Sequence, residues 1–233
     1  MNSIDIEQGT QEWFDERLGR LTASKFYCIM TQPQAQRDRE AGKLSRTAES
    51  YLIEKVTELL TGESRELKDK ALEWGKQYEE EARKMYELER MVTVKQVGFI
   101  PHKTIPIIGC SPDGLLEDRG LEIKCPHRSS NFTKYLYGAD IPKSYYTQIQ
   151  ASMYITGLNK WDFVVYNPRV KNEKFRLYVK TVDRDEDYIE KIDEQLSRVL
   201  IVYENMLKKV DLTFLDVLEN KLSNNNNETN EDN

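Results

Sequence analysis

The stretch from Gly109 to Pro126, GCSPDGLLEDRGLEIKCP, holds the residues whose types and spacing could do chemistry. Asp113 lies in a Ser-Pro-Asp-Gly turn, and Glu122 and Lys124 follow two residues apart in a short apolar run. Two carboxylates directed at one point repel each other unless a cation lies between them. Carboxylate oxygens without a histidine or thiolate partner favour Mg²⁺, with Mn²⁺ as the alternative.

A short β-strand over Leu121 to Cys125 would position this acid and this lysine. Side chains two residues apart on a strand point to the same face. Glu122 and Lys124 are therefore expected together, facing a cleft, while the apolar residues of the run pack into a core from the other face. The proline and glycine that flank Asp113 allow a sharp turn, which would direct its carboxylate back at the pair.

Turn and strand together fit the PD-(D/E)xK nuclease signature, with eight residues between Asp113 and Glu122. An acid-x-lysine pair alone is common on solvated sheet faces, and the preceding turn is what favours a functional interpretation. In such a site Asp113, Glu122 and the Ile123 carbonyl would bind Mg²⁺, with two ions about 4 Å apart on the attacking and leaving oxygens. Lys124 would position a water and favour its hydroxide form.

Four motifs, in the family's order, resemble the phage lambda exonuclease family, also called the YqaJ-like viral recombinases. They are EWFDERLGRLTAS at 12–24, WGKQYEEEAR at 74–83, SPDGL with LEIKCP at 111–126, and YYTQIQASMYITG at 145–157. The resemblance covers roughly residues 7–210. It implies a metal-dependent exonuclease that digests one strand of linear duplex DNA from the 5′ end and leaves 3′ single-stranded overhangs.

The resemblance further implies a ring-shaped homotrimer, a single-strand annealing protein as partner, and a phage or prophage protein acting in a bacterial host cell. Competing interpretations remain. One is a binding module that recognises DNA ends as a recombination scaffold without catalysis, against which the intact acids and lysine argue. The other is an endonuclease of the same superfamily, which would cut covalently closed circles that an exonuclease spares.

Arg17 and Ser24 are the candidate ligands of the DNA 5′-phosphate. Thr22 could cap a helix starting near Ala23, and a helix start offers free N–H groups and partial positive charge to an anion. The same residues also fit an ordinary capped surface helix with a solvated arginine. The resemblance favours the phosphate site, because it matches both residues to family members that contact the DNA end.

Glu79 and Gln148 enter the candidate site through the resemblance alone. Glu79, the acid directly after GKQY, would help hold the metal, although acids on helices are mostly solvated. Gln148 would orient the attacking water or a phosphate oxygen, and it is expected on one helix face with Tyr145 and Ser152. Without the family pattern, both would be assigned to the surface.

Composition bounds these interpretations. A net charge of −6 argues against a protein that coats DNA, because duplex affinity comes largely from Lys and Arg, whereas an enzyme needs only a local basic lining. The three cysteines are few and widely spaced, which predicts buried free thiols and does not support an iron–sulfur cluster. No apolar run could span a membrane and no signal peptide is evident, so a cytoplasmic location is expected.

The expected elements describe an α/β domain with a mixed central β-sheet flanked by helices, a PD-(D/E)xK restriction-endonuclease-like core. Helices are predicted at 47–60, 68–90, from 142 onward and at 184–209, and strands at 92–100, 104–110, 121–125, 161–166 and 174–182. Residues 32–46 are predicted to be a mobile basic loop. Residues 1–212 are expected to form a single nuclease domain, with a tail at 213–233 that is disordered from about residue 222.

Overall fold

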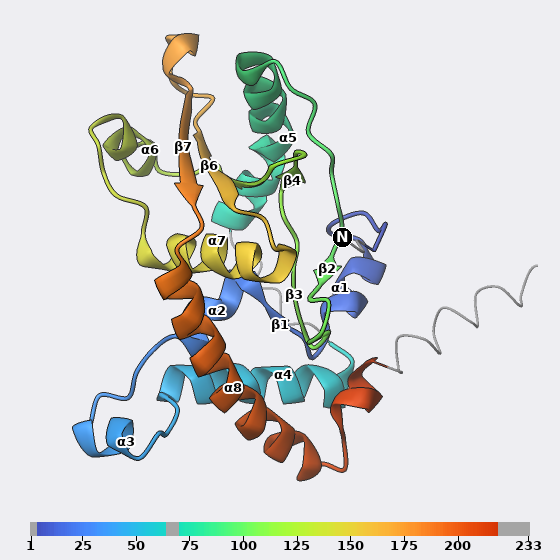
Figure 1. Cartoon of the computed structure of the whole chain (residues 1–233). Coiled ribbons are helices and arrows are strands. Elements are labelled where there is room, and N and C mark those ends of the chain that lie inside the picture. Colours follow the sequence, from blue (N-terminus) through green and yellow to red (C-terminus); the bar gives the residue numbers. More distant parts are fainter. Residues whose placement is uncertain (1–3, 64–69, 219–233) are drawn as a thin grey trace, which may run out of the picture.

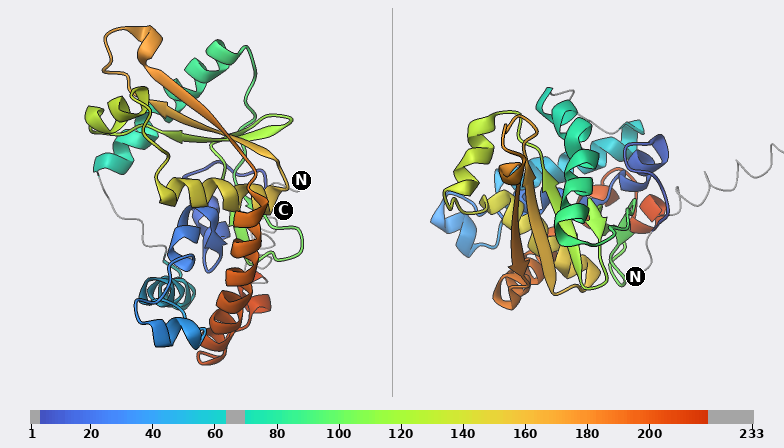
Figure 2. Two further views of the ribbon diagram at one scale, coloured as in Figure 1. Left: turned by 60° about the vertical axis from the view of Figure 1, so that its left-hand side comes forward. Right: turned by 90° about the horizontal axis from the view of Figure 1, so that it is seen from above.

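The computed structural model describes residues 4–63 and 70–218, and the side chains of 70–72 are outside that description. The tail predicted to be disordered from about residue 222 lies outside the described residues. Two parts of the molecule stand out in Figures 1 and 2: the larger sheet with α5 and α6, and a helical part around α4 and α8. Helix α7 lies between them.

The larger sheet has the order β4-β5-β6-β7. Its strands are β4 (Gly114–Leu115), β5 (Arg119–Lys124), β6 (Lys160–Tyr166) and β7 (Leu177–Asp183). Only the central β5–β6 pair is parallel, and β4 and β7 join antiparallel at the two edges. The sheet is therefore mixed, as the sequence predicts.

Helices cover both faces of this sheet. Helix α5 (Lys70–Arg90) packs Ala82 and Tyr86 onto one face, against alternate side chains of β5 and β6. Helices α6 (Ser129–Leu136) and α7 (Lys143–Thr156) pack onto the other. Strand β6 is buried from both sides along nearly its whole length, and its residues 163–166 are continuously apolar.

The second sheet is small, with the order β1-β3-β2. It consists of β1 (Leu21–Thr22), β2 (Ile100–Pro101) and β3 (Ile108–Cys110). The strands predicted at 92–100 and 104–110 are therefore much longer than β2 and β3, the strands that form there. Among the described residues, 92–99 pair only through isolated bridges at Lys95 and Phe99. The turn before β3 contains Pro106, which has no N–H for a ladder.

The helical part forms the largest core cluster, with α4 (Arg46–Thr61) and α8 (Glu186–Lys208) as its long helices. Local sequence signals set their ends. The Ser45 hydroxyl accepts from the Ala48 N–H at the start of α4, and Gly62 ends it with φ +69°. The helix predicted at 184–209 is α8, and its buried side chains recur at three- and four-residue steps, so it is a core helix. Val217 is also buried in this core, beyond the expected domain boundary at residue 212.

Three shorter helices lie in the first forty residues: α1 (Gln11–Arg17), α2 (Phe26–Ile29) and α3 (Gln36–Glu40). A 3₁₀ turn, η1 (Ala23–Lys25), precedes α2, and another, η2 (Glu173–Phe175), precedes β7. The prediction that 32–46 is only a loop was wrong, because α3 occupies its centre.

Two further expectations concern the whole chain. All three cysteines are buried and free, as predicted. In the described part of the chain, no helix has both the length and the apolar character needed to cross a membrane.

Candidate functional site

The turn that carries Asp113 folds back onto β5. The Asp113 N–H donates to the Leu121 carbonyl at 3.2 Å, and its Oδ2 accepts from the Ile123 N–H at 2.6 Å. The carboxylate is therefore held directly over the strand, at the residue between the acid and the lysine. Such a short loop can do this because Gly114 starts β4, which turns antiparallel onto β5.

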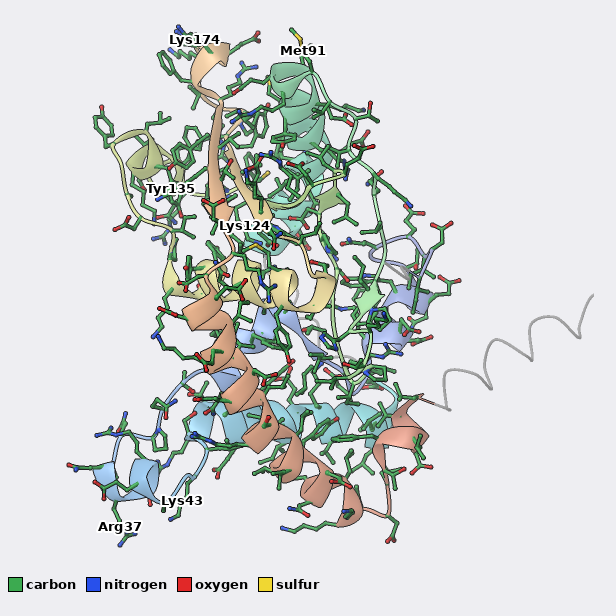
Figure 3. The ribbon with its side chains drawn as sticks, viewed as in Figure 1. Arg37, Lys43, Met91, Lys124, Tyr135 and Lys174 are labelled. Atoms are coloured by element: carbon green, nitrogen blue, oxygen red, sulfur yellow. The ribbon has the colours of Figure 1, made fainter. Side chains whose placement is uncertain are left out.

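Glu122 and Lys124 share one face of β5, as the two-residue alternation predicts. The Lys124 ammonium donates to Glu122 Oε1, and Glu122 is only 2% exposed. The remaining strand residues, Leu121, Ile123 and Cys125, pack into the core beneath α5. Lys124 lies between the sheet and α7, with Nζ 5.1 Å from the Tyr145 ring centroid (Figure 3).

The carboxylates of this site repel one another. Burial, together with the charges of Glu122 and Glu79, raises the pKa of Asp113 well above its usual range. Burial also raises the pKa of Glu79, with Glu122 adding to the rise and Arg83 and Lys124 opposing it. For Lys124, burial lowers the pKa, but the neighbouring carboxylates outweigh it and the net pKa is raised. Lys124 is therefore a fixed ammonium in an acid-rich site.

This donor set fits a hard divalent cation. Asp113 and Glu122 supply carboxylates, and the Ile123 carbonyl lies on the strand between the two site side chains. Within residues 4–63 and 73–218, no three Asp, Glu, His or Cys side chains converge closely enough to enclose an ion. Mg²⁺ is usually held by one or two carboxylates and completes its shell with waters and substrate phosphates, so it matches such a site better than Zn²⁺ does.

Arg17 approaches the same turn from α1. Its Nη1 donates to Ser111 Oγ at 3.1 Å, and its guanidinium lies 4.1 Å from the Trp13 ring centroid. Ser111 directly precedes Pro112 and Asp113. The structure therefore brings the predicted phosphate-binding arginine next to the turn with the candidate metal ligand.

Ser24 reaches this edge through the small sheet. Strands β1 and β3 are parallel, so Ser24 and Ser111 both follow strand ends at the same edge. The predicted helix cap was wrong: Thr22 makes no capping bond, and its hydroxyl lies 3.3 Å from Ser24 Oγ. The helix begins as a 3₁₀ turn directly after β1, and the Thr22 N–H is bonded to the Tyr51 hydroxyl.

Gln148 lies one helical turn beyond Tyr145 on α7. Tyr145 contacts the Lys124 ammonium, and Ser152, further along the same face, lies close enough to Cys110 of β3 to oppose the rise in the pKa of its thiol. Gln148 is therefore on the helix face directed at the site. The second glutamine of this motif, Gln150, is fully buried and bonds the Asp183 carbonyl and the Asp185 N–H, which is a structural role.

Arg83 is a site residue that the sequence reasoning missed. It is buried, and its Nη1 lies 3.4 Å from the Asp113 carbonyl. When the Gln96 side-chain amide is oriented with its oxygen toward Arg83, that oxygen accepts from both terminal guanidinium nitrogens, at 2.6 and 2.9 Å. Arg83 follows Glu79 by four residues, which places both on one helix face. This spacing is the sequence signal that could have identified Arg83.

Gln8 was also missed. Its amide donates at 2.8 Å to both the Val97 and Pro112 carbonyls and so holds the turn from the N-terminal side. The Trp13 indole N–H adds contacts to the Gly98 carbonyl and to Ser111 Oγ. No local sequence pattern marks these contacts.

Comparison with known proteins shows similarity to one family model and to solved exonuclease structures. Residues 12–159 match the family model described as YqaJ-like viral recombinase domain. An alkaline exonuclease of Laribacter hongkongensis, LHK-Exo, is 31% identical, with a TM-score of 0.74 over 86% of this chain and 96% of that one. Its complex with dAMP matches with a TM-score of 0.75 and 30% identity, over 91% of this chain and 100% of that one.

Two further matches have lower sequence identity to this chain. A phage-related exonuclease of Haemophilus somnus 129PT shares the fold at 18% identity and a TM-score of 0.66, over 82% of this chain and 96% of that one. The protein R354 of Acanthamoeba polyphaga mimivirus is 27% identical over 172 residues, which are 68% of this chain but only 29% of that protein. The chain thus spans less than a third of that relative's length.

Proposed function

The chain belongs to the family of YqaJ-like viral recombinase domains, and from this premise we propose that it is a Mg²⁺-dependent exonuclease acting on 5′ ends of linear double-stranded DNA. A nuclease role is supported by its likeness to LHK-Exo, an alkaline exonuclease at 31% identity. The observation that carries the finer proposal is the Asp113 carboxylate, bonded to the Ile123 N–H between Glu122 and Lys124.

Each site residue has a role in this proposal. Asp113, Glu122, the Ile123 carbonyl and, at the edge, Glu79 would hold one or two Mg²⁺ ions, with Mn²⁺ as a substitute. The metal, when bound, lowers the pKa of a water and neutralises charge on the phosphate. Lys124 would position that water and favour its hydroxide form by its nearby positive charge.

Two further groups would position the DNA. Gln148, beside Tyr145 on α7, would orient the attacking water or a phosphate oxygen by its amide. Arg17 and Ser24 would bind the terminal 5′-phosphate at the edge where β1 and β3 end. The hydrogen bond from Arg17 to Ser111 supports this assignment, because it holds the guanidinium beside the turn that carries Asp113.

We also propose the assembly and pathway that this activity requires. A homotrimeric ring would keep the duplex enclosed during successive cuts. The 3′ overhang would pass to a single-strand annealing protein in the bacterial host cell, in recombination of phage or prophage origin.

The proposal is tested with linear duplex labelled at one 5′-phosphate end, beside a covalently closed circle, with Mg²⁺ and with chelator. We expect Mg²⁺-dependent release of label from the linear DNA and an intact circle. Cutting of the circle would indicate an endonuclease. Tight end binding without any cutting would indicate a scaffold.

The phosphate pocket has its own test, Arg17→Ala. Wild type should digest 5′-phosphorylated ends at least tenfold faster than 5′-hydroxyl ends, because a guanidinium–phosphate pair is worth about 1.5–3 kcal/mol. In the variant, the ratio of the digestion rates of 5′-phosphorylated and 5′-hydroxyl ends should fall toward one. An unchanged ratio in initial-rate assays would exclude Arg17 from phosphate recognition.

A further inference from the structure

A cluster of four side chains lies beside the candidate metal site, and none of them has a role in the mechanism above. The Trp74 cluster consists of Trp74 and Tyr78 on α5, His127 after β5, and Arg169 in the β6–β7 connection. The Tyr78 ring lies 4.3 Å and the His127 ring 5.4 Å from the Trp74 ring, between centroids. The Arg169 guanidinium carbon lies 3.8 Å from the Trp74 centroid.

Arg169 is fixed in this cluster before any ligand binds. Its Nη1 donates to the His127 carbonyl at 2.8 Å, and its guanidinium stacks on the indole. Its backbone is set as well, because the Arg169 N–H donates to Oδ1 of Asn167, a residue that is only 1% exposed. An arginine ordered in this way loses little side-chain entropy when it binds a ligand.

The charge of Arg169 nevertheless faces solvent. Arg169 is exposed, and the ion pairs of the described residues include no carboxylate partner for it. Arg128, next to His127, is exposed too and adds positive charge to this surface. The chain as a whole carries a net charge of −6. A preorganised cation next to an acid-rich site therefore differs in charge from the rest of the surface.

The cluster lies at the end of β5 that carries the site. Trp74 and Tyr78 pack against the core that contains Ile123 and Cys125, and His127 follows Lys124 by three residues where the chain leaves β5. DNA that lies along this end of β5 would bring a backbone phosphate close to this rim.

We propose that Arg169 binds a backbone phosphate of the DNA at the rim of the metal site, with the Trp74 cluster holding its guanidinium in place. The inference rests on the proposed nuclease function and adds a contact outside the 5′-phosphate pocket. A guanidinium suits this ligand because its planar N–H groups can meet two phosphate oxygens at once. The contact is independent of sequence and of the terminal phosphate.

The test is fluorescence anisotropy with a 5′-phosphorylated linear duplex in chelator, so that binding is measured without cleavage. Dissociation constants are taken across a NaCl series for wild type, Arg169→Gln and Arg169→Met. Methionine keeps apolar contact with Trp74 and guards against a packing defect. Losing one phosphate contact should reduce the log–log salt slope by about 0.9 in both variants.

Lys174→Gln is the matched control, since Lys174 is an exposed cation at the tip of the same connection, away from Lys124 (Figure 3). It should keep the wild-type slope. Wild-type slopes in both Arg169 variants, or an equal loss in Lys174→Gln, would overturn the Arg169 contact and leave the nuclease proposal standing. A wild-type protein that does not bind DNA ends would overturn both proposals.

Discussion

Lys124 is half-buried among carboxylates and carries a positive charge there. In the metal-free protein, burial lowers its pKa but the neighbouring carboxylates outweigh this and raise it, so the ammonium form is favoured. Lys124→Ala should therefore lower the cleavage rate by about 10²–10⁴-fold, the range for loss of a positioned charged group, while metal and DNA-end binding persist. Single-turnover cleavage and end binding in chelator measure the two effects separately.

Lys180→Ala is a suitable control for that experiment, because Lys180 is an exposed lysine on β7. It should leave both quantities unchanged. Wild-type turnover in Lys124→Ala would remove this lysine from the mechanism.

Arg83 acts on the site through Asp113. Lysine in its place keeps the charge but cannot reach the Asp113 carbonyl and Gln96 together. In Arg83→Lys we expect the Mg²⁺ concentration for half-maximal rate to rise several-fold, with a near wild-type rate at saturating Mg²⁺. Mg²⁺ titrations of the cleavage rate measure this, with Arg90→Lys at the exposed end of α5 as control. A parallel loss of rate at all Mg²⁺ concentrations would contradict a positioning role.

The residues that sequence alone could place are those joined by local geometry. Asp113, Glu122 and Lys124 fall within one turn and one strand, so the two-residue period and a Pro-Asp-Gly turn suffice. Arg83 and Gln8 reach the same turn from 30 and 104 residues away. Such contacts follow from tertiary packing, which one sequence without its fold does not specify.

At the scale of elements, local features can again be predicted from the sequence, whereas features that depend on tertiary packing cannot. The ends of α4 are determined by local residues, the Ser45 cap at its start and Gly62 at its end. The strand predicted at 92–100 has a suitable alternating sequence, but a strand also needs a partner along its length. Residues around Gly98 instead pack against the N-terminal segment, so closely that a Cβ there would lie 2.1 Å from the Ile6 carbonyl oxygen.

The parallel pairing of β1 with β3 shows what the sequence could not supply. Strand β1 has only two residues, too few for a sequence pattern to identify, yet its pairing with β3 brings the start of η1 to the metal turn. The phosphate-binding roles expected for Arg17 and Ser24 came from the family resemblance. The position of Ser24 near the Asp113 turn follows from the pairing, because parallel strands end at the same edge of a sheet.

At the scale of the whole molecule, the site should weaken the metal-free fold. Asp113 is half-buried near Glu122 and Glu79, and desolvation together with these two charges raises its pKa. A carboxyl group whose pKa is higher in the folded than in the unfolded protein favours folding only while it is protonated. In metal-free protein at neutral pH, ionised Asp113 should therefore lower the free energy of unfolding.

Asp113→Asn removes this charge, and its amide oxygen can still accept from the Ile123 N–H. In chelator we expect the variant to unfold at a higher temperature than wild type, by about 2–4 °C for each kcal/mol of repulsion removed. Mg²⁺ should raise Tm in wild type and much less in the variant, since a ligand stabilises the state that binds it.

Scanning calorimetry with and without Mg²⁺ measures both effects, with Asp140→Asn at an exposed position as control. Equal Mg²⁺ responses in wild type and Asp113→Asn would exclude Asp113 as a ligand. A lower Tm for the variant in chelator would mean that its hydrogen bond to β5 outweighs the repulsion, so the acid would contribute to the fold as well as to the chemistry.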